Sequence, residues 1–283
     1  MAFEFTERLK KLPPYLFVEI DKAKRRARAE GRDIIDLGIG DPDESTPKEI
    51  IESLYKAACD SKNHHYPLDQ GSSVFRDRIA KWYKERFNVI LDQEKEILPL
   101  VGSKEGISHM PLAFINPGDI SLVPDPCYPP YKSGTILAGG IPYIMPLTEE
   151  NNFLPDLNKI KSETLKKAKV IYINYPNNPT ASVCEKTFFE NIVLFAKKYN
   201  LIVASDAAYS EIAFDGYRPD SFLKAEGGKE TGVEFHSLSK TCNMTGWRIG
   251  FACGNEKIIS GIAKVKSNID SGIFTAIQMA GVT

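Results

Sequence analysis

The stretch KVIYINYPNNPTA, residues 169–181, has the form of a buried β-strand that ends in a rigid polar turn. Its apolar residues run on without polar alternation, which is typical of a strand covered on both faces. The next apolar run, LIVASD at 201–206, follows a helix-compatible segment at 188–198. Apolar strands that alternate with helices indicate a mostly parallel sheet with helices on both faces.

The same alternation extends along most of the chain. Helices are expected at 15–30, from Pro47 after a hydroxyl cap, and after Gly71. The run IIDLGIG at 34–40 is expected to be a short strand. The other expected strands are the Val- and Ile-rich runs EILPLVG (96–102), DISLVP (119–124), IPYIMP (141–146), VEFHSL (233–238) and RIGFACG (248–254). The predicted fold class is α/β, with three layers in the order α/β/α.

Composition narrows the class of protein. With 283 residues and 42% hydrophobic content, the chain can bury a full core, and we expect one large domain with a smaller appendage. The net charge of −1 gives no global field that would favour nucleic acid or an anionic membrane. Five scattered cysteines without a C-x-x-C pair favour reduced thiols over a disulfide framework or a metal site. Without a signal-like or membrane-spanning apolar run, we expect a soluble cytoplasmic protein.

Polar residues follow the predicted strands at their carboxyl ends, where open parallel sheets bind ligands. Gly102, Ser103 and Lys104 lead from a strand into a helix, so their backbone N–H groups and a hydroxyl suit a phosphate. An ordinary hydroxyl cap explains the same residues. Tyr128, in the Pro-rich loop DPCYPPY, suits stacking on a planar ring, or simple packing.

Two more strand ends carry candidate ligand-binding groups. Asn177 and Asn178 lie between Pro176 and Pro179, where their amides can donate to a ligand oxygen or close the turn. Asp206 ends a very apolar strand, and a buried carboxylate there needs a cationic partner. A solvated loop acid is the alternative for Asp206.

The stretch HSLSKTCNMTGWRIG, residues 236–250, gives these groups a common meaning. Lys240 lies between hydroxyl residues and is followed by Arg248. A lysine that forms a Schiff base must lose its proton, which burial and nearby positive charge promote. Ser237, Ser239 and Arg248 can hold a phosphate beside it. An amine, a phosphate cradle, a stacking ring, a donor to a phenolic oxygen and an acid for a ring nitrogen match pyridoxal 5'-phosphate. A cofactor-free α/β domain would need five coincident placements.

The motifs YPNNPT, SDAAY and SLSKTCNMTGWRIG, with Asp206 and Lys240 thirty-four positions apart, resemble the class I/II aminotransferases among the fold-type I pyridoxal-phosphate enzymes. The resemblance implies that Lys240 forms the Schiff base and acts as the general base. It also implies that Asp206 pairs with the protonated ring nitrogen, that Tyr209 and Asn178 bond the phenolic oxygen, and that Tyr128 stacks on the ring.

The resemblance assigns the remaining groups as well. It places Gly40 of LGIGDPDESTP, together with Asn178, near the substrate, and Tyr66 of YPLDQG on the phosphate of a neighbouring subunit, which implies a homodimer with shared active sites. The substrates would be an amino acid and a 2-oxo acid such as 2-oxoglutarate. The implied phosphate-binding residues are Ser103, Lys104, Ser237, Ser239 and Arg248.

A narrower resemblance links LPPYLFVEID and GSKEGISHMPLAFINPGD to the family branch that acts on LL-diaminopimelate. In that branch the tyrosine matching Tyr15 approaches the substrate, although Tyr15 can equally anchor the N-terminal arm. Two alternatives stay open: a pyridoxal-phosphate-binding protein without efficient turnover, and a pyridoxal-phosphate-dependent C–S lyase.

The resemblance also predicts the domain organisation. Residues 1–45 would form an N-terminal arm and part of a small domain, and residues 46–283 the cofactor-binding large domain. The sequence ends at AIQMAGVT, inside what the resemblance makes a helix of the large domain. We therefore expect the small domain to be incomplete and to lack the arginine that clamps the substrate carboxylate.

Overall fold

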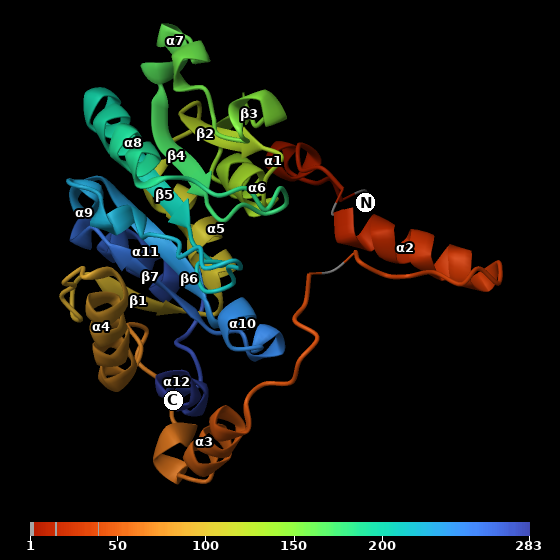
Figure 1. Ribbon diagram of the computed structural model, residues 1–283, viewed down its shortest axis with the longest axis vertical. Coiled ribbons are helices and arrows are strands. Elements are labelled where there is room, and N and C mark those ends of the chain that lie inside the picture. Colours follow the sequence, from red (N-terminus) through yellow and green to blue (C-terminus); the bar gives the residue numbers. More distant parts are fainter. Residues whose placement is uncertain (1–2, 15, 39) are drawn as a thin grey trace.

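The computed structural model describes residues 3–14, 16–38 and 40–283, and a seven-stranded sheet forms its centre (Figure 1). The strand order is β1-β7-β6-β5-β4-β2-β3. The strands are β1 (Ile97–Leu100), β2 (Ile120–Asp125), β3 (Ile141–Pro146), β4 (Ala168–Asn174), β5 (Ile202–Asp206), β6 (Gly232–Ser237) and β7 (Gly250–Gly254). All seven strands predicted in the 96–254 region are confirmed.

The sheet is mostly parallel. Strands β3, β2, β4, β5 and β6 run in one direction, and β7 is antiparallel to both of its neighbours, β6 and β1. The carboxyl ends of β4, β5 and β6 therefore meet at one edge of the sheet.

Helices make up the outer layers and the N-terminal part. The α-helices are α1 (Glu7–Lys10), α2 (Leu16–Ala29), α3 (Lys48–Ala58), α4 (Ser73–Phe87), α5 (Ser103–Phe114), α6 (Pro130–Leu137), α7 (Ser162–Leu165), α8 (Lys186–Tyr199), α9 (Gly228–Thr231), α10 (Leu238–Thr241), α11 (Glu256–Ile269) and α12 (Thr275–Val282). The 3₁₀ turns are η1 (Ser61–His64), η2 (Glu149–Asn151), η3 (Leu157–Lys159), η4 (Phe222–Lys224) and η5 (Thr245–Trp247).

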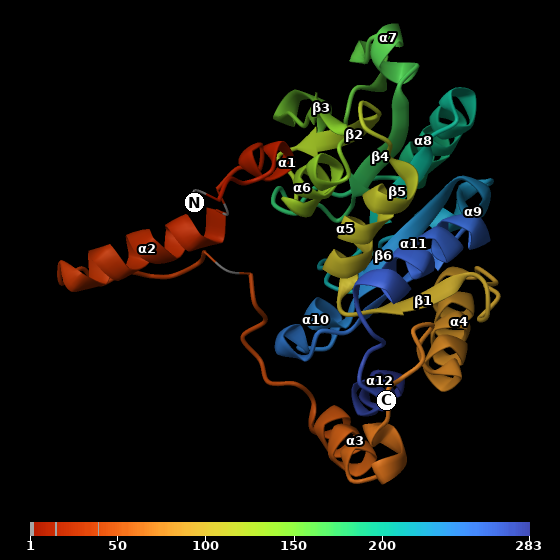
Figure 2. The same cartoon turned by 180° about the vertical axis from the view of Figure 1, so that it is seen from behind.

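Two apolar cores lie on opposite faces of the sheet. Ile171 and Ile173 of β4 join the core that contains α4 and α8. Their neighbours Val170 and Tyr172 point to the other face, into the core formed with α5, α6 and α11. Figure 2 shows α5 and α11 in front of the sheet when the molecule is seen from behind. The predicted three-layer α/β/α architecture is confirmed.

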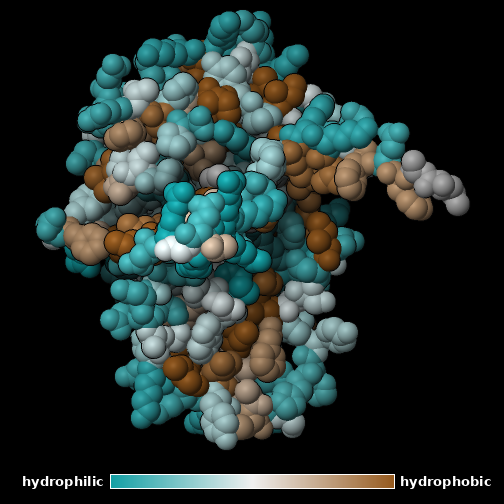
Figure 3. Space-filling model, turned by 90° about the vertical axis from the view of Figure 1, so that its right-hand side faces the viewer, coloured by the Kyte–Doolittle hydropathy of each residue, from teal (hydrophilic) through white to brown (hydrophobic). Residues whose placement is uncertain are grey.

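The N-terminal arm lies beside this body. Helix α1 packs against α6, where the guanidinium of Arg8 donates to the carbonyl of Leu137 at 3.1 Å. Helix α2 projects away from the sheet (Figures 1 and 2). In Figure 3 this helix points toward the viewer, and hydrophobic atoms form patches above and below it. Among the described residues, no helix combines the length and apolar character needed to cross a membrane.

The strand expected at 34–40 is not formed in the described part of that stretch. Ile35 and Leu37 are 90% and 89% exposed, and no described strand pairs with the segment. A strand needs a neighbour to take up its backbone hydrogen bonds, and this apolar run lies outside the sheet.

Helix α3, which was expected to begin at Pro47, begins one residue later. Pro47 is the N-cap of α3, with an extended backbone, and Lys48 is the first helical residue. The hydroxyl of Thr46 does not cap the helix, because it donates instead to the carbonyl of Asn243 at 2.6 Å. That bond ties the 45–47 segment to the loop after α10.

Candidate active site

The candidate site lies at the edge where β4, β5 and β6 end. Asn174, the last residue of β4, is in register with Asp206, the last residue of β5. The amide of Asn174 donates to the carbonyl of Asp206 at 2.7 Å. Ser237 ends β6, and α10 with Lys240 follows directly. The topology thus brings the polar strand ends predicted from the sequence to one edge.

Asp206 is buried and bonded only to neutral donors. One carboxylate oxygen accepts from the hydroxyl of Tyr131 at 2.7 Å, and the other from the N–H of Ala208 at 3.3 Å. Burial raises the pKa of Asp206 to about 6, although the Tyr131 and Ala208 bonds oppose that shift. Within the described residues, no lysine or arginine forms an ion pair with this carboxylate. Tyr131 was not predicted from the sequence as a site residue, although it ends the DPCYPPY loop that contains Tyr128.

Three predicted ligand groups surround this carboxylate or its strand. Tyr128 is half-buried, and its ring meets Tyr131 edge to face with 5.9 Å between centroids. Tyr209 is half-buried, and burial together with the charge of Asp206 raises its pKa. The N–H of Asn178 donates to the side chain of Asn174 at 2.7 Å.

The two neighbouring asparagines of the YPNNPT turn differ in role. The side-chain oxygen of Asn177 accepts from the N–H and the hydroxyl of Thr180, at 3.0 and 2.8 Å, so Asn177 closes the turn. Asn178 is half-buried, and its side-chain amide makes no hydrogen bond with another residue that the structure describes. Of the two amides, Asn178 therefore remains available to a ligand.

Lys240 meets the segment predicted to bind substrate. Its ammonium donates to the carbonyl of Gly40 at 2.5 Å and lies 3.7 Å from the carboxylate of Asp41. The Lys240 side chain is 19% exposed. Residues 200 positions apart in the sequence are thus in contact. Asp41 was not predicted from the sequence as a charge beside this amine.

Arg248 and the start of α5 converge on a second part of the site. A Cβ atom on Gly102, whose φ is +75°, would overlap the Arg248 guanidinium. Arg248 itself has a left-handed backbone, with φ 56° and ψ 58°, a strained conformation that is often retained for function. Its guanidinium donates to the carbonyl of Thr245 at 2.8 Å and to the hydroxyl of Ser239 at 3.4 Å.

The hydroxyl-bearing residues of this part have local partners as well. The Ser237 hydroxyl accepts from the N–H of Ser239 at 3.2 Å and so caps α10. Ser103 is buried, and a Cβ on Gly250 would lie 3.0 Å from its backbone nitrogen. Lys104 follows it on the exposed side of α5. The predicted phosphate-binding residues therefore come together around Gly102 and Arg248.

Two predicted residues are not part of the described site. Tyr66 lies after η1 and is 92% exposed, without a hydrogen bond to another residue in the described ranges. Tyr15 lies outside the described residues.

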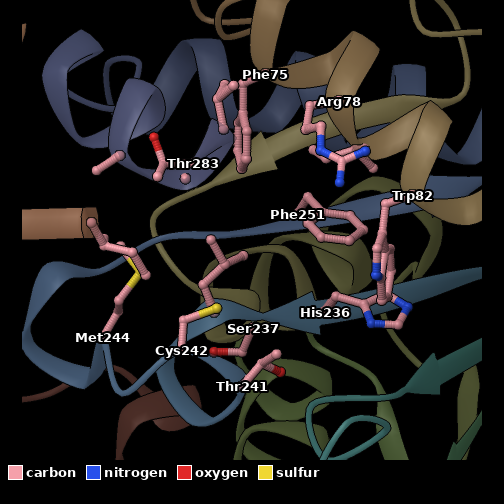
Figure 4. Close-up of a pocket in the computed structure, with 16 residues that line it drawn as sticks. Phe75, Arg78, Trp82, His236, Ser237, Thr241, Cys242, Met244, Phe251 and Thr283 are labelled. Carbon is pink, nitrogen blue, oxygen red and sulfur yellow. The ribbon is translucent and has the colours of Figure 1, made fainter. Parts of the chain in front are cut away.

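An apolar pocket of about 190 Å³ lies behind the lysine-bearing segment (Figure 4). Arg78 and Trp82 reach into it from α4, and Cys242 from the loop after α10. Neither Lys240 nor Asp206 lines it, and Ser237 is the one predicted site residue among its lining residues.

Comparison with known families and relatives agrees with this geometry. The family model described as aminotransferase class I and II matches residues 32–283. The LL-diaminopimelate aminotransferase of Syntrophobacter fumaroxidans is 57% identical over all of this chain and 73% of its own length. The enzyme of the same name from Aquifex aeolicus is 56% identical, over 99% of this chain and 72% of its own.

Solved structures match over the same extent. The apo form of BacF from Bacillus subtilis superimposes with a TM-score of 0.94 at 39% identity, covering 99% of this chain and 72% of that one. A single mutant of the Thermus thermophilus aspartate aminotransferase gives a TM-score of 0.91 at 25% identity, over 99% and 72% of the two chains.

Proposed function

Because this chain belongs to the class I and II aminotransferase family, we propose that it moves an amino group from an amino acid to a 2-oxo acid such as 2-oxoglutarate. The observation that carries the proposal is the buried carboxylate of Asp206, which has only neutral donors and ends a strand beside the Lys240 segment. LL-2,6-diaminopimelate is the proposed amino donor, supported by the names of the relatives that are 53–57% identical.

Class I and II aminotransferases use pyridoxal 5'-phosphate, and the residues of this chain fit that group. Asp206 is a buried acid without a cationic partner among the described residues, as a protonated pyridine nitrogen requires. At the other end, the absence of a side chain at Gly102 leaves room for the Arg248 guanidinium beside the start of α5. A guanidinium next to free backbone N–H groups suits a phosphate.

When bound, pyridoxal 5'-phosphate supplies an aldehyde that condenses with amines and a ring that accepts the electrons left at the substrate α-carbon. We assign to Asp206 the task of holding the proton on the ring nitrogen. Tyr209 and the side-chain amide of Asn178 would donate to the phenolic oxygen, and Tyr128 would stack on the ring. Lys240 would act as the general base that removes the proton from the substrate α-carbon.

The phosphate end is assigned to the backbone of Ser103 and Lys104, to the hydroxyls of Ser237 and Ser239, and to Arg248. Before cofactor binds, the Lys240 ammonium is held by Gly40 and Asp41. These two acceptors lie where an ammonium group is already bound, and we assign Gly40 and Asn178 to substrate binding.

The assembly is part of the same proposal. We propose a homodimer in which the exposed Tyr66 reaches the phosphate of the partner chain. We further propose that residues 46–283, which contain the whole sheet, form the cofactor-binding large domain and that residues 1–45 form the N-terminal arm and part of a small domain. A cytoplasmic location is supported by five cysteines that are all unpaired.

The test is a panel of amino donors, given with 2-oxoglutarate to the cofactor-loaded protein. Consumption of LL-diaminopimelate with equimolar glutamate formation supports the proposal, and Lys240→Ala serves as the inactive control. Pyruvate and ammonia from a sulfur amino acid would replace it with a C–S lyase. Cofactor binding with no response to any donor would leave a binding protein without turnover and overturn the proposal.

A further inference from the structure

A buried ammonium links α11 to the start of α5. The Lys266 side chain is 1% exposed, and its ammonium lies 2.6 Å from a carboxylate oxygen of Glu105 and 2.6 Å from one of Asp270. It also donates to the carbonyl of Ser271 at 3.2 Å. A lysine this deeply buried is tolerated only when such partners take up its charge.

Glu105 and Asp270 already have a positively charged partner in Lys266. Glu105, His109 and Asp270 bring their ligand atoms within 4.8 Å of one another, a spacing that would suit a metal ion. The Lys266 ammonium lies between the two acids at hydrogen-bond distance from both. The cluster is therefore an internal ion-pair network that is complete without an added cation.

The second oxygen of Glu105 reaches the turn before α5. It accepts from the N–H of Val101 at 2.5 Å, while the N–H of Gly102 donates to the carbonyl of Leu100 at 2.7 Å. One carboxylate thus connects a buried ammonium to the backbone at 101. Ser103 and Lys104, which follow this turn, carry the N–H groups assigned above to the phosphate.

The Lys266 ammonium offsets part of the negative charge behind the turn. An unpaired carboxylate behind the turn would repel a phosphate in front of it. Burial, with the neighbouring Asp270, raises the pKa of Glu105 to about 7, and Lys266 opposes that shift. The ammonium thus favours the ionised form of Glu105, which accepts both bonds, and offsets its charge.

We propose that Glu105 and Lys266 are positioning residues for the cofactor phosphate: they fix the 101–104 turn in the conformation that presents its N–H groups. This inference rests on the proposed function, since it assumes that the turn binds the phosphate of pyridoxal 5'-phosphate. It assigns no contact with the ring or with the substrate.

The test compares two ligands that differ only in the phosphate, pyridoxal 5'-phosphate and pyridoxal, titrated into the apoprotein by absorbance. In Glu105→Gln, the amide can accept only one of the two bonds that the carboxylate accepts. We expect the dissociation constant for pyridoxal 5'-phosphate to rise at least tenfold and that for pyridoxal to change less than twofold. Inorganic phosphate should compete at least tenfold less well in the variant.

A matched control is available on another part of the chain. Glu96 accepts from the N–H of Asp92 and from the Lys229 ammonium, both at 2.8 Å. Glu96→Gln removes a similar link and should leave both dissociation constants within twofold of the parent. Lys266→Met should repeat the selective loss, and Lys266→Arg should restore much of the affinity, which a general loss of folding would not.

Equal weakening of both ligands, or unchanged binding of pyridoxal 5'-phosphate in Glu105→Gln, overturns the inference. If Lys266→Met does not fold, the Glu105→Gln comparison still decides. Failure of the parent protein to bind pyridoxal 5'-phosphate would instead contradict the proposed function.

Discussion

Two buried carboxylates lie on the neighbouring strands β5 and β6, Asp206 at the end of the first and Glu234 within the second. Asp206 is 5% exposed and Glu234 1%. Glu234 accepts from the hydroxyls of Tyr83 and Ser205 and from the N–H of Phe222, at 2.8, 3.1 and 2.8 Å. The imidazole Nε2 of His236 lies 3.1 Å from a carboxylate oxygen of Glu234. Asp206 has two donors, from Tyr131 and Ala208.

The pKa values of the two acids move in opposite directions. Burial raises the pKa of both, but at Glu234 the bonds and charge of His236, with the Tyr83 hydroxyl, hold the pKa below its ordinary value. At Asp206 the donors do not compensate, and the pKa stands at about 6. Glu234 has its partners within the fold, whereas Asp206 forms no ion pair with a cation in the described part of the chain, and a ligand can supply one. Under the proposed function, the contrast separates a structural acid from a functional one.

The largest effect should come from Asp206→Asn, which keeps the shape but removes the charge. We expect kcat/KM for transamination to fall by about 10²- to 10³-fold, because a charged group aimed at the reacting system is lost. Steady-state kinetics with the preferred donor checks this. A fall of less than threefold would place Asp206 with the structural acids.

Glu234→Gln should show the opposite profile. An amide can satisfy only some of the donors around Glu234, so we expect the free energy of unfolding to drop by about 3 kcal/mol. Denaturant unfolding of the apoprotein measures it. Activity per folded molecule should stay within about threefold of the parent, and a selective loss of activity without loss of stability would contradict the structural role.

The two acids should also give opposite slopes of stability against pH. Because the folded pKa of Asp206 is about 6 against an ordinary 3.8, the folded apoprotein keeps a proton that the unfolded chain has lost. Stability from this group is full below about pH 4 and falls as pH rises through 6, by up to about 3 kcal/mol. Stability from Glu234, whose pKa is lowered, is instead present above its ordinary pKa and lost at lower pH.

Asp206→Asn removes the stability contribution that Asp206 loses as the pH rises. The free energy of unfolding of the apo variant, relative to that of the apo parent, should therefore be at least about 1 kcal/mol higher at pH 8 than at pH 4. Thermal or urea unfolding at both pH values provides the comparison. An unchanged difference between the two proteins would show that Asp206 titrates normally.

The smallest effect is expected for Tyr131→Phe, which removes one hydrogen bond from Asp206. A hydrogen bond to a charged group contributes about 1.5 kcal/mol, so the dissociation constant for pyridoxal 5'-phosphate should rise about tenfold at neutral pH. The bond lowers the pKa of Asp206, so its loss should weaken binding less at pH 8 than at pH 6. Equal losses at both pH values would contradict this explanation.

Sequence patterns predicted the sheet and the edge where the site lies, because both depend on local features. The apolar run of β4 and the polar residues that end it, Asn174 to Asn178, are contiguous in the chain. Asp206 ends β5 in the same way. Parallel strands then bring such ends together without further information.

Other features depend on partners far away in the chain. The apolar run at 34–40 looked like a strand, but whether it pairs depends on the sheet that the rest of the chain builds. Tyr131 meets Asp206 across 75 positions, and Tyr83 meets Glu234 across 151. Lys266 and Glu105 are 161 positions apart. A single sequence shows that such residues exist but not which of them meet.

The antiparallel direction of β7 has a consequence for how this chemistry can vary. Ser237, the last residue of β6, is paired directly with Gly250, the first residue of β7. Lys240 and Arg248 therefore lie on one loop, residues 238–249, whose two ends meet at a single residue pair of the sheet. Met244 and Ile249 of this loop are buried in the core, so sequence changes that keep these two residues would leave the strand register in place.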